Sequence, residues 1–184
     1  MKTFVVHVEN KPGVLTRVAS LFRRRAFNID SLTVGRTEKA EVSRMTITVD
    51  ADRDQARRIE ASLYKLVNVL LVEDITDEPA ITRDLAMIKV AAQHEERSHV
   101  LQLVNVFRAR VVDVSPESLT IEITGGEDKI DGLLEVLRPF GVLEMVRTGI
   151  VAMRRGSKSS LIPLPAENMD EVIAETTDDE AQSV

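Results

Sequence analysis

The segment Val8-Glu9-Asn10-Lys11-Pro12-Gly13-Val14-Leu15 decides the fold of the first half of this chain, because it leads from a β-strand into an α-helix through one short turn. Apolar residues alternate over residues 3–8 and then recur at helical spacing over residues 14–22. Pro12 suits the first position of a helix, and Gly13 leaves the amides of the first helical turn uncovered. The segment therefore predicts a helix start at which a small anion can bind.

A free amino acid is the ligand that this turn fits best. Its carboxylate can lie against the helix N-terminus. The side chain of Asn10 can either cap the helix or offer its oxygen to an ammonium group. The simpler interpretation is that Asn-x-Pro-Gly only starts a helix, and the turn alone leaves both interpretations open.

The first 77 residues follow the order βαββαβ. Residues 28–35 and 42–49 have the pattern of two strands joined by a polar connection, which indicates a hairpin. Apolar positions over residues 56–66 predict a second helix, and the β-branched residues of 67–75 predict a closing strand. This order is that of the split βαβ, or ferredoxin-like, motif.

The same order returns between residues 82 and 156. We expect strands at residues 85–91, 110–114, 119–124 and 142–153, and helices over residues 100–107 and 130–137. The chain is therefore predicted to be an α+β protein of two tandem ferredoxin-like units. The copies differ after their first strand, where the second has Gln93-His94-Glu95-Glu96 and neither the proline nor the glycine of the first.

Residues 157–184 have a different composition. A serine-rich stretch and two prolines precede an acidic run between Glu167 and Glu180. Because this segment offers few apolar side chains to a core, we expect a disordered acidic tail.

The overall composition excludes several classes of function. The 24 Lys and Arg residues against 30 Asp and Glu give a net charge of -6, the wrong sign for a protein that neutralises nucleic-acid phosphates. The absence of cysteine excludes disulfides and thiolate chemistry and fits a reducing cytoplasm. The apolar run over residues 66–72 is too short to span a membrane, and the N-terminus lacks the features of a secretion signal. We therefore expect a cytoplasmic protein with no nucleic-acid or membrane partner.

No constellation of residues predicts catalysis or a metal site. The three histidines, His7, His94 and His99, do not have metal-ligand spacing, and no phosphate loop or paired carboxylates are evident. RNA binding is disfavoured because aromatic residues make up 3% of the chain, and the strand at residues 42–49 has none on which bases could stack. Binding and interaction remain as the favoured class.

The strand over residues 29–34 carries apolar groups on both of its faces. One face of a sheet covered by helices stays open, and an edge strand of this kind is suited to pairing with another chain. We therefore expect the first unit to form a homodimer or a higher oligomer.

Several segments of the chain resemble one family closely. They are the opening turn, the stretch Phe27-Asn28-Ile29-Asp30-Ser31-Leu32-Thr33-Val34-Gly35, the tetrapeptide Ser43-Arg44-Met45-Thr46 and the stretch Leu63-Tyr64-Lys65-Leu66-Val67-Asn68-Val69. Together they resemble the regulatory (small) subunit of acetolactate synthase, also called acetohydroxyacid synthase, over roughly residues 1–155. The Asn-x-x-Gly turn alone is shared by many amino-acid-sensing ACT domains.

The resemblance implies an ACT domain at residues 1–77, for effector binding and dimerisation, followed by a C-terminal ferredoxin-like domain at residues 82–156. The implied role is to bind the catalytic (large) subunit, raise its activity and confer feedback inhibition by valine or another branched-chain amino acid. The chain itself would then carry no chemistry and no cofactor. Thiamine diphosphate, magnesium and FAD would belong to the catalytic subunit.

The resemblance also implies a site shared by two protomers. By matching motif positions, one wall comprises Asn10, Pro12, Gly13, Val14 and Leu15, and the other comprises Asn28, Ile29 and Thr33 of the second protomer. No catalytic or metal-binding residue is implied.

Two other functions stay open at this point. The chain could be a stand-alone ACT-type sensor that regulates a different enzyme or a transcription factor, with the same effector site and another partner. A small ferredoxin-like enzyme is the weaker alternative, because catalytic residues are missing. The second unit and the Ser-Arg-Met-Thr segment favour the regulatory subunit.

Overall fold

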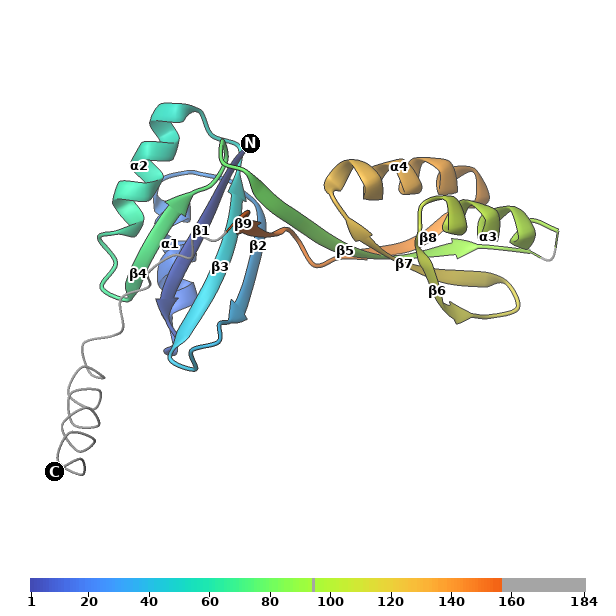
Figure 1. Ribbon diagram of the computed structural model, residues 1–184, viewed down its shortest axis with the longest axis horizontal. Helices are drawn as coiled ribbons and strands as arrows, with labels where there is room; N and C mark the ends of the chain where they lie inside the picture. Colours follow the sequence, from blue (N-terminus) through green and yellow to red (C-terminus); the bar gives the residue numbers. More distant parts are fainter. Residues whose placement is uncertain (94, 157–184) are drawn as a thin grey trace, which may run out of the picture. The chain divides into compact units, whose positions relative to one another are not determined.

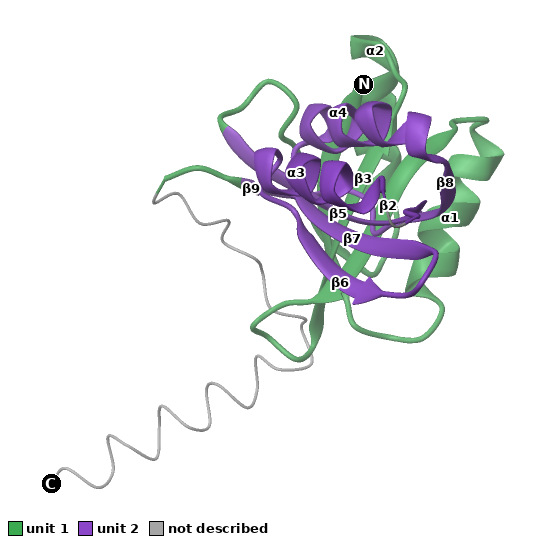
Figure 2. Cartoon of the chain, turned by 90° about the vertical axis from the view of Figure 1, so that its right-hand side faces the viewer, with its two compact units in different colours: residues 1–79, 154–184 green, residues 80–153 purple. Residues whose placement is uncertain are grey.

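The computed structural model describes residues 1–93 and 95–156, which divide into two compact units (Figures 1 and 2). Among the described residues, the first unit is formed by Met1–Pro79 together with residues 154–156, and the second by Ala80–Met153. The predicted tail over residues 157–184 lies outside the described residues.

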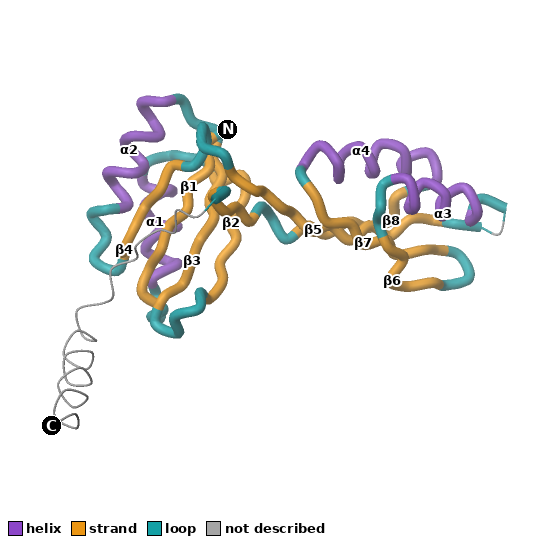
Figure 3. The backbone as a smooth tube through the Cα atoms, in the orientation of Figure 1, coloured by secondary structure: helices purple, strands orange, loops and turns teal. Residues whose placement is uncertain are grey.

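The first unit is a four-stranded antiparallel sheet with both helices on one face (Figure 3). Its strands lie in the order β2-β3-β1-β4. In chain order its elements are β1 (Lys2–Glu9), α1 (Val14–Arg24), β2 (Ile29–Arg36), β3 (Val42–Val49), α2 (Arg53–Leu63) and β4 (Val69–Asp74).

The second unit repeats this architecture, with strand order β6-β7-β5-β8 and one added strand, β9, that pairs with β5. Its elements are β5 (Ala80–Ala91), α3 (Arg97–Val106), β6 (Arg110–Val114), β7 (Ser118–Gly125), α4 (Glu127–Leu137), the short 3-10 helix η1 (Arg138–Phe140), β8 (Val142–Arg147) and β9 (Val151–Arg154). The prediction of an α+β protein with two tandem βαββαβ units is confirmed.

Alternation along β1 places every second side chain against the helices. Phe4, Val6 and Val8 are fully buried there, and they pack in one cluster with Phe22 of α1 and Ile59 of α2. Burial of each such side chain contributes about 1.5–3 kcal/mol. The sheet and its helices are therefore held by one continuous apolar layer.

The second unit has an equivalent core. Ile88 of β5 and Ile121 of β7 pair across the sheet and are fully buried. Val100 of α3 and Ile130 of α4 cover them from the helical side. The helical stripes predicted from the sequence bury most of their members, but Leu15 and Leu101 are 44% and 39% exposed.

The final strand differs from the sequence prediction. Instead of one strand over residues 142–153, β8 ends at Arg147 and β9 begins at Val151. Gly149 lies between them with a φ of 87°, a left-handed conformation that breaks the strand. The chain then pairs with the first part of β5, which extends β5 to Ala80 beyond the predicted start.

Asp84 holds this break in place. Its side chain is 4% exposed and accepts hydrogen bonds from Arg147 Nε at 2.7 Å, Thr148 Oγ1 at 3.2 Å and Gly149 N at 3.2 Å. Arg147 also donates to the half-exposed Asp131 at 3.0 Å. A buried carboxylate with three donors therefore fixes the connection between β8 and β9.

We predict that Asp84→Ala lowers the free energy of unfolding by about 2–3 kcal/mol, because Arg147, Thr148 and Gly149 all lose their buried acceptor. Urea denaturation followed by circular dichroism measures this. Asp131→Ala is the matched control and should cost less than about 1 kcal/mol, because its partner contact is solvent-exposed. Equal losses in the two variants would contradict the role given to Asp84.

Candidate functional site

The turn between β1 and α1 carries an unusual helix start. α1 begins at Val14, and its N-cap residue Gly13 has φ 82° and ψ -7°, in the left-handed region. Pro12 lies before the N-cap, so the expectation that it occupies the first helical position is wrong. The residue that directly precedes the helix is instead Gly13, which adopts the left-handed conformation readily.

The first turn of α1 keeps free backbone donors. The first intrahelical bond joins Arg17 N to Gly13 O at 3.0 Å, and Val14 N makes a long contact of 3.4 Å with Lys11 O. Within the described residues, the amides of Leu15 and Thr16 donate to no acceptor, and no side chain caps the helix. A Cβ built on Gly13 would meet no atom within 4 Å, so the space in front of these amides is open.

The other helices begin differently. Asp52 caps α2 by accepting from Gln55 N at 2.8 Å, in a complete capping box. Glu96 is the N-cap residue of α3, and Glu127 and Asp128 lie in the first turn of α4. Among these four α-helices, only α1 therefore has no carboxylate at its N-cap or in its first turn.

Asn10 does not cap α1, which corrects one of its two predicted roles. Its Nδ2 donates to Ala40 O at 2.9 Å, its Oδ1 accepts from Ser43 Oγ at 3.1 Å, and its N donates to Glu41 O at 2.7 Å. Asn10 thus fastens the turn to the connection between β2 and β3. Its Oδ1 has a second lone pair that can accept from an ammonium group.

Asn68 fixes the turn from the other side, and sequence reasoning did not assign it a role. Its backbone carbonyl accepts from Glu9 N at 2.9 Å, and its Nδ2 donates to the Glu9 carboxylate. Its Oδ1 accepts from the Arg17 guanidinium, in the first turns of α1. One side chain therefore joins the end of β1, the start of α1 and the connection before β4.

The residues predicted for the site fall into two groups within one chain. Asn10, Pro12, Gly13 and Leu15 are exposed at the turn, whereas Val14 is buried beneath it. Ile29 begins β2 and pairs with Val49, which also pairs with Lys2 at the start of β1.

The second group therefore begins at the opposite end of the sheet. Asn28 precedes β2, and Thr33 is near the middle of β2, opposite Thr46. The turn follows Glu9, which lies at the other end of the eight-residue strand β1 from Lys2, a span of roughly 20 Å. A single chain does not bring Asn28 and Ile29 to the turn.

His7 lies on the face of β1 away from the helices, between Val6 and Val8. It is 4% exposed, and its Nδ1 has no hydrogen-bond partner. Burial lowers its pKa below 6.5, and the nearby Arg44 guanidinium lowers it further.

The described residues contain no group of three His, Asp or Glu side chains that could hold a metal ion.

No helix in the described part of the chain has the length and apolar character needed to cross a membrane.

A four-stranded sheet in this order, with two helices on one face, is a ferredoxin-like fold, and with the glycine turn after its first strand it has the architecture of an ACT domain. Residues 4–71 match the model of the AHAS small subunit-like ACT domain, and residues 83–156 match that of the small subunit of acetolactate synthase. The chain belongs to the family of acetolactate synthase small subunits.

Individual relatives support this assignment. The chain is 51% identical to the acetolactate synthase small subunit of Mycobacterium bovis and 48% identical to that of Mycolicibacterium smegmatis. Each alignment covers 85% of this chain, and 93% and 92% of the relatives, respectively. The crystal structure of the small subunit from Thermotoga maritima is similar, with a TM-score of 0.79 and 42% identity over 85% of this chain and 98% of that one.

We predict that Asn68→Ala loosens the start of α1, because Glu9 and Arg17 lose a shared partner. Hydrogen exchange at the amides of α1 should become faster by an amount equivalent to about 1–2 kcal/mol, with α2 much less affected. Asp54→Ala is the control, since it removes an exposed carboxylate in the first turn of α2, away from the turn between β1 and α1, and should change exchange in α1 little. Unchanged exchange in Asn68→Ala would refute the role given to Asn68.

Proposed function

We propose that the chain binds a branched-chain amino acid, most simply valine, at the turn between β1 and α1, and so regulates the catalytic subunit of acetolactate synthase. The observation that carries this is the uncapped start of α1 behind the left-handed Gly13. The effector carboxylate would accept from the free amides, and Asn10 Oδ1 would accept from its ammonium group. Leu15, 44% exposed, offers an apolar contact for the branched side chain.

A second chain would supply the other wall. β2 is an edge strand, with β3 on one side only. Antiparallel pairing of β2 with its counterpart about a two-fold axis sets Ile29 of one chain beside the Arg36 end of the other. In each chain, the turn between β1 and α1 lies at the Arg36 end of β2. The arrangement would bring Asn28, Ile29 and Thr33 towards the turn of a partner, and a homodimer is therefore part of the proposal.

Regulation would follow from this shared site. An effector that contacts two chains binds the geometry in which both walls are correctly set, and it shifts the population towards that geometry. A coupling of about 1–3 kcal/mol changes affinity or activity roughly 5- to 150-fold, which is enough for feedback control. The catalytic subunit would supply thiamine diphosphate, magnesium and FAD, and this chain would bring none of them.

The first test is reconstitution. The purified chain should form no acetolactate from pyruvate, should raise the rate of the catalytic subunit on mixing, and should make that rate sensitive to valine. A colorimetric acetolactate assay with each component alone and together measures all three. Turnover by this chain alone, or a rate unchanged by mixing, would overturn the proposal.

The second test compares Gly13→Asp with Gly13→Asn. Both variants place a similar side chain at a left-handed position, which Asp and Asn tolerate better than most residues. Only Asp adds a negative charge in front of the free amides. Valine should therefore bind Gly13→Asp at least tenfold more weakly than Gly13→Asn, a difference of about 1.4 kcal/mol.

Calorimetry on this chain and inhibition of the reconstituted enzyme should both show this difference. Asn10→Ala should also weaken binding by about tenfold, and Ser43→Ala, which removes only the donor to Asn10, should weaken it less. Equal affinities of the Asp and Asn variants would mean that the turn is only a helix start.

A further inference from the structure

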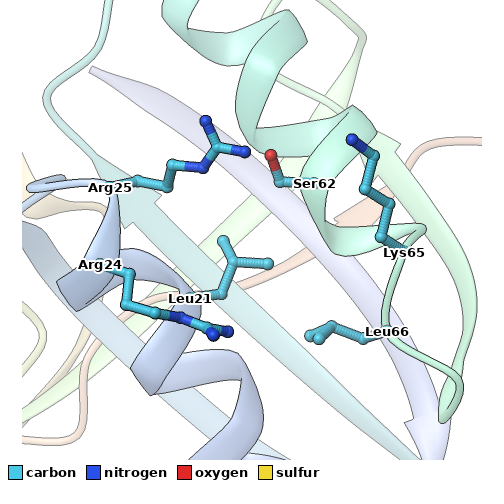
Figure 4. A pocket seen from close by; sticks show the side chains of 6 residues that line it. All are labelled: Leu21, Arg24, Arg25, Ser62, Lys65 and Leu66. Atoms are coloured by element: carbon cyan, nitrogen blue, oxygen red, sulfur yellow. The ribbon is translucent and has the colours of Figure 1, made fainter.

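A pocket on the helical side of the first unit carries three cations. It has a volume of about 410 Å³ and lies between α1 and α2. Its lining residues are Leu21 of α1, Arg24 and Arg25 at the end of α1, Ser62 of α2, and Lys65 and Leu66 just after α2. In Figure 4, Arg24 and Arg25 lie on one side, Ser62 and Lys65 on the other, and Leu21 and Leu66 lie between them. We call this the basic pocket.

The cations of the basic pocket lack counter-charges. No acidic residue lines it, and among the described residues Arg24, Arg25 and Lys65 form neither an ion pair nor a side-chain hydrogen bond. The end of α1 favours basic residues through its dipole, which accounts for Arg24. The end of α2 favours Lys65 in the same way, because Lys65 directly follows its C-cap residue Tyr64. Neither dipole supplies a carboxylate with which these side chains can pair. Charges of one sign that converge from two elements indicate a site for an anion.

The charge balance of the chain shows where such an anion is available. Residues 157–184 contain one of the 24 Lys and Arg residues and seven of the 30 Asp and Glu residues. Residues 1–156 therefore have 23 of each sign and no net charge. The whole net charge of -6 lies in the C-terminal segment. Its seven carboxylates all fall between Glu167 and Glu180.

We propose that the acidic segment 167–180 of this chain binds the basic pocket. Its carboxylates can pair with the guanidinium groups of Arg24 and Arg25, a geometry that Arg favours. Apolar residues occur within the same segment, at Met169, Val172 and Ile173, and can contact Leu21 and Leu66. The acidic segment and the basic pocket are thus complementary both in charge and in apolar surface.

The length of the intervening chain permits this contact. Ten residues, 157–166, separate Gly156 from the acidic segment and can span about 33–36 Å. A unit of about 80 residues has a radius of gyration near 12 Å and is therefore about 30 Å across. The span of the connection thus exceeds the diameter of the unit, so the segment can reach a large part of its surface. The proposal does not depend on the function proposed above.

The absence of cysteine allows a direct test on the full chain. A nitroxide label attached to Ala174→Cys should broaden the backbone NMR signals of Leu21, Arg24, Ser62 and Lys65, because the label lies near the pocket when the segment is bound. Addition of 0.5 M salt should reverse the broadening, since screening weakens exposed ion pairs.

Paired charge reversals provide the control. Arg24→Glu with Lys65→Glu should reduce the broadening at Leu21 and Ser62 at least fivefold. Arg23→Glu with Arg57→Glu makes the same change of charge on α1 and α2 at exposed residues outside the pocket and should leave the broadening in place. Equal effects of the two double variants would overturn the proposal.

Two further outcomes would also overturn it. Broadening confined to another surface, or to no surface, would show that the segment does not occupy the pocket. In the second outcome, the label causes no broadening while added inorganic phosphate shifts the NMR signals of the pocket residues. That result would indicate a site for small anions instead.

Discussion

The positive φ of Gly13 is the constraint on which the site of the first unit depends. A left-handed residue at this point ends the turn after β1 without a side-chain cap, so the amides of Leu15 and Thr16 stay open to solvent. An L-residue other than glycine would be strained there, and its Cβ would enter the open space in front of the helix. The backbone, rather than a charged side chain, thus provides the attraction for an anion.

The rest of the first unit holds this turn rigidly. Asn10 ties it to the connection between β2 and β3, and Asn68 ties it to α1 and β4. The second unit has the same strand order but starts α3 at Glu96, with a right-handed φ of -85°. The two units share one fold, but the first has an uncapped helix start at α1, whereas the second has the carboxylate of Glu96 at the start of α3.

Local patterns predicted most of this architecture. Alternation in β1 and the helical stripe of α1 identified core residues such as Val6 and Val18, because each residue's burial follows from its neighbours along the chain. The break at Gly149 was missed, because β-branched residues continue on both sides and hide it. Asn68 was missed because its partners Glu9 and Arg17 are more than fifty residues away. The turn itself was identified, yet Pro12 was placed two positions too far into the helix.

The register of the first sheet has a consequence for the effector site proposed above. Since Ile29 and the turn lie at opposite ends of the sheet, an amino acid that contacts both must bridge two chains. Effector binding and self-association are then thermodynamically linked, and each strengthens the other by the same factor. The apparent sensitivity would depend on the abundance of the sensor itself. At low protein concentration the same amount of effector would produce a weaker response.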